Sequence, residues 1–167
     1  MVVRLPAGAE GRSARVTVLR LGEVAAAVDG RRLERVDAAE LSGAALPPGA
    51  YVVRVWYRGR LVIERAVPVI SGSRARMELP AAKLAAIEYD AGVARARDRD
   101  DLRYFRRAVR LDPRHTPAHL QLAAAALFHG NLTEAESRAG LVRTLDPGNP
   151  HANRIARLIR QMRRRQR

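Results

Sequence analysis

Hydrophobic and polar residues alternate along the first eighty positions, most clearly in the stretch YVVRVWYRGRLVIERAVPVI from Tyr51 to Ile70. The residues at 51, 53, 55 and 57 fall on one side of an extended chain and their neighbours on the other, as a half-buried strand requires. Arg58-Gly59 can turn the chain into a second strand. Pro68 cannot donate to a ladder, which places that second strand at an edge or at a bulge.

Shorter alternations predict further strands. We expect them at 13–21, 24–30 and 74–79, with a hairpin turn at Asp29-Gly30 and a loop over 42–50. In the last of these strands Ala75, Met77 and Leu79 share one face. Short antiparallel strands at this spacing indicate a small β-sandwich.

The order VDG, LPPGAYVVRV, a glycine turn, ERAVPV and RARMEL resembles the PEGA domain, a bacterial family of prealbumin-like or Ig-like sandwiches. Pro48, Gly49 and Tyr51 match the family's motif, and Ala50 replaces its usual glutamate. Carboxypeptidase-regulatory-like sandwiches have a similar pattern. The resemblance covers roughly Arg15–Leu79 and implies a sandwich domain at 13–80 after an N-terminal tail at 1–12. It brings no catalytic residues.

From about Ala81 the hydrophobic period becomes helical, and we expect helices from there to the C-terminus. The triplet Leu-Asp-Pro occurs at 111–113 and again at 145–147, a step of 34 residues. A 34-residue period with two helices per unit is the signature of tetratricopeptide (TPR) repeats, and the chain resembles that family over 81–167. The leucine then packs inward, and the proline ends the second helix of each unit.

The second unit carries most of this resemblance. It matches the family at Pro117, Leu122, Ala123, Gly130, Ala135, Val142 and Pro147. Smaller or more polar residues stand where the family has large aromatic ones, namely His119, Ala126 and Ala139. We expect Ala126, Ala135 and Ala139 to be buried where helices approach closely. The first unit is degraded and matches at Phe105, Ala108 and Pro113.

After Pro147 comes a basic helix that resembles the capping helix of such arrays. Ala152, Ile155, Ala156, Ile159 and Met162 form one apolar stripe, which we expect to lie against Leu141, Val142 and Leu145. The stretch from Pro150 to Arg167 holds seven Arg and no acidic residue, within a net charge of +14. Such a block can attract nucleic acid or another polyanion. An Arg-rich composition with one Lys is also what a GC-rich genome produces.

TPR units have apolar faces that only a neighbour can cover, and this chain has fewer than the three units usually needed. A second copy of the chain, the sandwich or a partner then covers the open end. The resemblance implies a concave groove lined by the first helix of each unit, where an apolar or amphipathic segment binds. Mapped onto this sequence, the groove consists of Leu120, Ala124, Leu127, Phe128, Arg154, Leu158 and Met162.

The sequence contains no pattern typical of a catalytic site, a phosphate-binding loop or a metal site. Cysteine is absent, which excludes disulfides, thiolate metal sites and a cysteine nucleophile. His115 and His119 have a metal-like spacing, but Pro117 between them starts a helix, so we expect a structural or solvated role for both. No phosphate-binding glycine loop and no nucleophile elbow occurs. We therefore expect no enzyme, no cofactor and no metal.

The sequence favours a protein–protein interaction or scaffold protein that docks a partner segment, or itself, through the short array. One alternative is polyanion binding by Arg157, Arg160, Arg163, Arg164 and Arg165. Another is a structural subunit of a larger bacterial assembly. No apolar run reaches the length of a signal-peptide core or a membrane span, so we expect a cytoplasmic protein. A periplasmic or surface location follows if a leader was removed.

Overall fold

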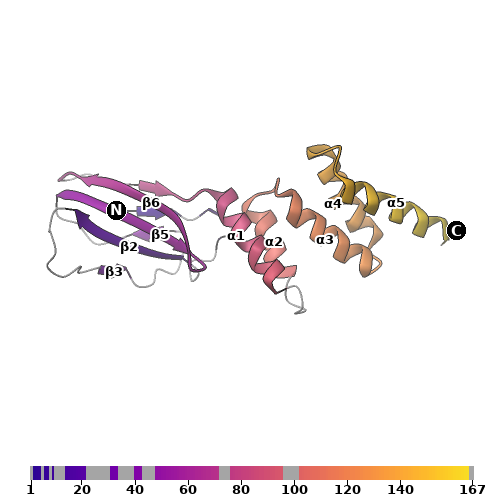
Figure 1. Cartoon of the computed structure of the whole chain (residues 1–167), viewed down its shortest axis with the longest axis horizontal. Coiled ribbons are helices and arrows are strands. Elements are labelled where there is room, and N and C mark those ends of the chain that lie inside the picture. Colours follow the sequence, from indigo (N-terminus) through magenta and orange to yellow (C-terminus); the bar gives the residue numbers. More distant parts are fainter. Residues whose placement is uncertain are drawn as a thin grey trace. The chain divides into compact units, whose positions relative to one another are not determined.

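The fold is mixed, with strands in the first part of the chain and helices in the second (Figure 1). A computed structural model describes residues 2–4, 6–7, 9, 14–21, 31–33, 40–42, 48–71, 76–95 and 102–165. The chain forms two compact units, Met1–Ile87 and Glu88–Arg167. Their division lies inside helix α1 (Ala81–Ala94), a few residues beyond the predicted change from strand to helix at Pro80-Ala81.

The larger sheet has the strand order β3-β2-β5-β6, and every pairing in it is antiparallel. Its strands are β2 (Ala14–Leu21), β3 (Arg31–Leu33), β5 (Gly49–Tyr57) and β6 (Arg60–Val69). The predicted alternation of β5 is confirmed, because Tyr51, Val53, Val55 and Tyr57 are all buried. They provide the apolar face of this sheet together with Val16 of β2.

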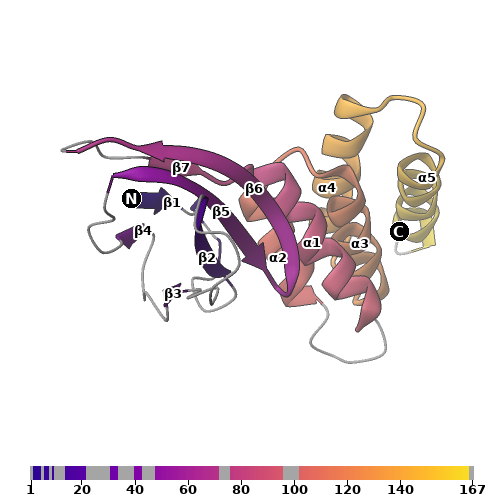
Figure 2. The ribbon, with the colours of Figure 1, turned by 60° about the vertical axis from the view of Figure 1, so that its left-hand side comes forward.

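A two-residue turn joins β5 to β6, and Figure 2 shows the two strands side by side as one long, curved hairpin. Arg58 and Gly59 both have positive φ, 48° and 76°, which suits the right-handed twist of the strands on either side. β6 lies at the end of its sheet, so the prediction that Pro68 belongs to an edge strand is confirmed.

A second, three-stranded sheet has the order β4-β1-β7, formed by β1 (Val2–Arg4), β4 (Glu40–Ser42) and β7 (Arg76–Glu78). Two expectations were wrong here. The predicted tail at 1–12 contains β1, and β1 pairs with β7 in parallel, so the strands are not all antiparallel. The residues of β1, Val2-Val3-Arg4, do not alternate, so no period of two marks this strand in the sequence. The strand predicted at 24–30 lies outside the described residues.

Helix α1 begins at Ala81 and contacts the β unit through its first turn. Lys83, the one lysine of the chain, donates from Nζ to the carbonyl oxygen of Val62 in β6 at 2.6 Å. The other helices are α2 (Leu102–Leu111), α3 (Thr116–Phe128), α4 (Leu132–Leu145) and α5 (Pro150–Arg165). No strand follows Pro80 in the described part of the chain, as predicted.

The turn after α2 is built again after α4. In each turn the aspartate amide donates to the carbonyl four residues before it, at 2.9 Å for Asp112 and 2.7 Å for Asp146. The residue three positions further on donates its amide to the aspartate carbonyl, at 3.0 Å for His115 and 3.1 Å for Asn149. The paired residues lie 34 positions apart. The sequence repeat is therefore also a repeat of hydrogen bonds.

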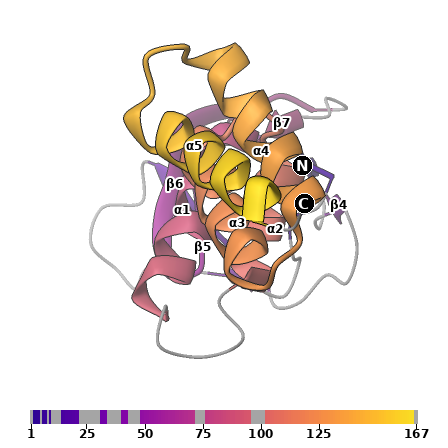
Figure 3. The same cartoon turned by 90° about the vertical axis from the view of Figure 1, so that its right-hand side faces the viewer.

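The last residue of each turn caps the helix that follows. His115 Nδ1 accepts from the amide of Ala118 at 3.2 Å at the start of α3, and Asn149 Oδ1 accepts from the amide of Ala152 at 3.1 Å at the start of α5. A cap of this kind satisfies an amide that has no partner inside the helix. Helices α3 and α5 thus start in the same way, and α4 connects them in the chain; Figure 3 shows the three helices together.

A small apolar core holds α3, α4 and α5 together. It consists of Ala123, Ala126, Ala135, Ala139, Ile155 and Ile159, all at most 8% exposed. The expectation that Ala126, Ala135 and Ala139 are buried is confirmed. The predicted partners of the α5 stripe were partly wrong: the isoleucines pack on these alanines, while Leu141 is 38% exposed. Methyl side chains on α3 and α4 leave the space that the isoleucines fill.

Gly92 of α1 lies against the ring of Phe105 in α2. A Cβ atom at Gly92 would come within 2.7 Å of the Phe105 ring, and Phe105 itself is 2% exposed. One unit further on, the two equivalent positions are Ala126 and Ala139, both buried. The first unit therefore fills this pair of helix positions with a glycine and a phenylalanine, and the second unit fills it with two alanines.

We predict opposite effects for two helical glycines. Gly92→Ala should lower the free energy of unfolding by about 1–3 kcal/mol, because the new methyl group overlaps a ring that is fully packed. Gly140→Ala in α4, where no atom lies within 4 Å of the added Cβ, should raise it by up to about 1 kcal/mol through helix propensity. Urea titration of the full chain measures both. A stabilising Gly92→Ala would show that α1 and α2 do not pack this way.

Candidate functional site

A cavity of about 540 Å³ lies between α3 and α5 in the helical unit. Helix α3 contributes residues spaced along one of its faces. Helix α5 contributes residues that follow them by 34 positions, one repeat unit later in the sequence. The described residues that line it are Tyr89, Thr116, Pro117, Leu120, Gln121, Ala124, Leu127, Asn149, His151, Arg154, Ile155 and Leu158. The repeated turn creates this arrangement, because it makes both helices begin at the same end of the cavity.

The structure brings five of the seven predicted groove residues together around this cavity: Leu120, Ala124, Leu127, Arg154 and Leu158. Phe128 is not among the lining residues and is 86% exposed at the last position of α3. Met162 is half-buried beyond the lined part of α5. Gln121, His151 and Tyr89 also line the cavity but were not predicted to do so. The repeat could have indicated His151, because it lies 34 positions after Pro117, which lines the cavity as well.

The two ends of the cavity differ in chemistry. Near the starts of α3 and α5 it is lined by Thr116, Asn149, His151 and Arg154, whereas toward the ends of the helices it is lined by Ala124, Leu127 and Leu158. Leu158 is 38% exposed, so an apolar ligand atom placed there removes apolar surface from water. This arrangement suits a ligand with a polar end and an apolar end.

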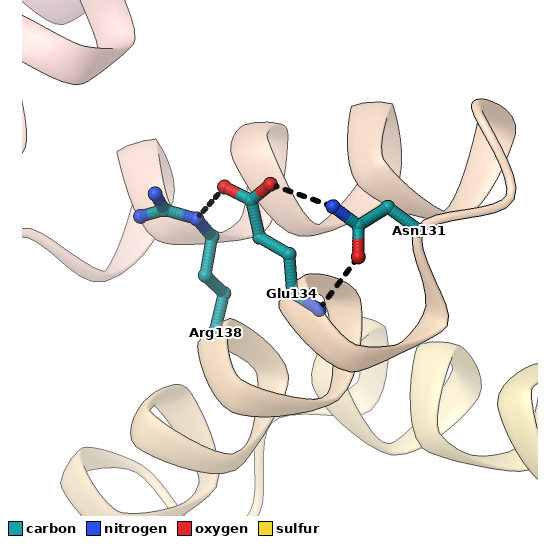
Figure 4. Close-up of polar contacts among 3 residues, drawn as sticks. All are labelled: Asn131, Glu134 and Arg138. Atoms are coloured by element: carbon teal, nitrogen blue, oxygen red, sulfur yellow. Dashed lines mark hydrogen bonds and ion pairs between the residues drawn. The ribbon is translucent and has the colours of Figure 1, made fainter.

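A second cavity, of about 590 Å³, lies at the start of α4 and is lined by His119, Asn131, Thr133, Glu134, Ser137, Arg138 and Leu141. Figure 4 shows how three of these residues bond to one another. Asn131 Oδ1 accepts from the amide of Glu134 at 3.1 Å, and the Glu134 carboxylate accepts from Asn131 Nδ2 at 3.3 Å and from Arg138 Nε at 2.9 Å. These groups cap α4 and largely satisfy each other.

Both histidines of the suspected pair have structural roles, as predicted. His115 caps α3, and His119, 7% exposed, donates from Nε2 to the carbonyl of Pro113 at 3.0 Å. Asn153 makes the equivalent bond to the carbonyl of Pro147 at 3.4 Å. In the described part of the chain no three His, Asp or Glu side chains come close enough together to hold a metal ion.

The basic residues of α5 fall into two groups. Arg163 forms two hydrogen bonds with the carboxylate of Glu136 in α4, at 2.7 and 3.3 Å. Arg157, Arg160, Arg164 and Arg165 are exposed and form no ion pair with any described residue. Of the five predicted polyanion-binding residues, four are thus available and one supports the contact between α4 and α5.

Comparisons with known proteins add no identification: no protein-family model and no curated protein matches the chain. Among the described helices, none has both the length and the apolar character needed to span a membrane.

Stability should depend on the charge of His115. Burial lowers the pKa of its imidazole below the ordinary value, although the nearby Asp112 acts in the opposite direction. The cap needs the neutral ring, because Nδ1 must accept the Ala118 amide. As the pH falls below about 6.5, the unfolded chain gains a proton before the folded chain does. The stability that the neutral His115 ring contributes is therefore present at neutral pH and is lost on acidification.

We predict that His115→Asn, which copies the cap at Asn149, keeps the cap and loses this pH dependence. Between pH 7.5 and 5.5 the parent should lose more unfolding free energy than the variant does, as measured by urea titration at each pH. His115→Ala should cost about 1 kcal/mol at pH 7.5, because it removes the cap. Equal pH dependence in parent and His115→Asn would contradict the role of the ring.

Proposed function

We propose that the protein is a non-catalytic interaction module, in which a PEGA-like sandwich precedes a short TPR-like array that binds a segment of another protein. The alternating β5–β6 hairpin and the two sheets in Met1–Ile87 support the sandwich. The TPR-like array is supported by the turn that recurs after 34 residues with the same hydrogen bonds. It is also supported by the buried alanines at the positions where the family packs its helices.

The observation that carries the proposal is the apolar surface exposed in the groove. Leu158 of α5 lines the cavity and is 38% exposed. Leu120, Ala124 and Leu127 extend this surface into the cavity. Apolar side chains that line a cavity open to solvent are typical of surfaces that bind peptides.

Leucines 158 and 141 allow a matched test. Both are 38% exposed, but Leu158 lines the groove and Leu141 lies on α4, outside it. A displayed library of random peptides is selected on the full chain, and each enriched peptide is then titrated against Leu158→Ser and Leu141→Ser. We predict that enriched peptides lose about tenfold or more in affinity on Leu158→Ser, because an apolar contact is removed, and little on Leu141→Ser.

Two results would contradict the groove as binding site. One is a peptide pool that binds both variants as tightly as the parent. The other is a pool that loses affinity only on Leu141→Ser, which would place binding at the cavity beside α4. Thermal melting of both variants serves as the control for folding.

A second candidate function, binding of nucleic acid or another polyanion, is favoured by Arg157, Arg160, Arg164 and Arg165, which lie outside the groove and form no ion pair with a described residue. We predict that replacing Arg157, Arg160, Arg164 and Arg165 with Gln leaves peptide binding in the groove unchanged, because only Arg154 of α5 lines it among the arginines. Affinity for heparin and for duplex DNA is measured against salt for the parent and the variant. If the parent binds DNA with a steep salt dependence that the variant lacks, polyanion binding becomes the leading function.

A further inference from the structure

The groove between α3 and α5 carries positive charge at one end and none of the opposite sign. Arg154 lines the cavity one turn into α5, with His151 one turn before it. None of the described residues that line the cavity is acidic. Arg154 forms no ion pair with a described residue, so its charge is available to a ligand.

Two helix N-termini add to this charge. The lining includes the first residues of α3, Thr116 and Pro117, and the N-cap of α5, Asn149. Neither helix has an acidic residue in its first turn, so nothing on the helices offsets the positive ends of their dipoles. Three acidic residues lie close to this end of the cavity without lining it. Asp112 and Asp90 act on the His115 ring, and the Asp146 carboxylate accepts from the Asn149 side-chain amide at 3.0 Å.

The apolar part of the groove has helical spacing. Leu120, Ala124 and Leu127 follow one another along α3 at steps of four and three, and Leu158 lies beside them on α5. From Thr116 to Leu127 the lined face of α3 is about 16 Å long at 1.5 Å per residue, which is about three turns of a ligand helix. A ligand with apolar residues at i, i+3 or i+4, and i+7 can contact this row along its length.

We propose that the groove takes an acidic amphipathic helix of a partner protein, with its apolar face on Leu127 and Leu158 and a carboxylate beside Arg154. This inference rests on the proposed function and adds the charge and the placement of the ligand. Charge complementarity selects the occupant, since a carboxylate meets a guanidinium and two helix N-termini at one end of the groove.

A second copy of α5 is a poor occupant for the same reason. Between Pro150 and Arg167 the chain has seven Arg and no acidic residue, so a copy of this helix would bring like charge to Arg154. Like charges placed face to face at an interface disfavour binding. The ligand must therefore be a segment with the opposite charge pattern.

The experiment sequences the library peptides whose binding depends on Leu158 and compares their Asp and Glu content with that of the starting library. We expect Asp and Glu to be enriched over the starting library in these peptides, one helical turn or more from their apolar residues. Arg154→Glu should weaken the acidic peptides about tenfold or more, because attraction becomes repulsion. Arg157→Glu makes the same change of charge on an α5 side chain outside the groove and should weaken them much less.

The possible failures are distinct. If no enriched peptide depends on Leu158, the proposed groove function fails and this inference with it. If peptides depend on Leu158 but are neutral or basic, or if Arg154→Glu weakens them no more than Arg157→Glu, the groove function stands and the acidic ligand is refuted. Peptides that weaken equally with both reversals would show a general attraction to the basic helix.

Discussion

The close approach of α3, α4 and α5 through alanine side chains is the contact on which the helical unit depends. Ala123 and Ala126 of α3 and Ala135 and Ala139 of α4 leave a hollow that Ile155 and Ile159 of α5 fill. Burying an isoleucine side chain contributes about 1.5–3 kcal/mol. The exposed pair of Arg163 and Glu136 contributes at most about 1 kcal/mol to the same contact. Apolar packing, rather than charge, therefore holds α5 in place.

The groove is a consequence of that packing. Arg154 and Leu158 stand next to the buried Ile155 and Ile159 in the sequence, so seating the isoleucines turns both residues toward the cavity. The N-caps at His115 and Asn149 fix where α3 and α5 begin. The short repeat thus supplies both walls of the groove, and Arg154 of α5 supplies the charge at one end of it.

Much of this could be predicted from the sequence where patterns are long. The alternation in 51–57 and its turn at Arg58-Gly59 determined the β5–β6 hairpin, because local residues decide both strand and turn. Strands β1, β3 and β4 escaped prediction, since each has three residues without a longer alternation around it and is stabilised by pairing with another segment. Strand β7 is as short, but it lies within the alternation at 74–79 that predicted it. Five groove residues were predicted by mapping the groove of the TPR family onto this sequence. Phe128 and Met162 fall outside the cavity because that mapping was extended to the helix ends.

The most direct test of the packing is amide hydrogen exchange, measured by mass spectrometry on the full chain and on the Ile155→Ala, Ile159→Ala double variant. Each substitution should cost about 2–5 kcal/mol, because it opens a cavity among the alanines. If α5 is part of the core, exchange in the variant should speed up in α3 and α4 together with α5. Faster exchange confined to Pro150–Arg165, with parental protection in α3 and α4, would show that α5 is an appended helix on which the packing of α3 and α4 does not depend.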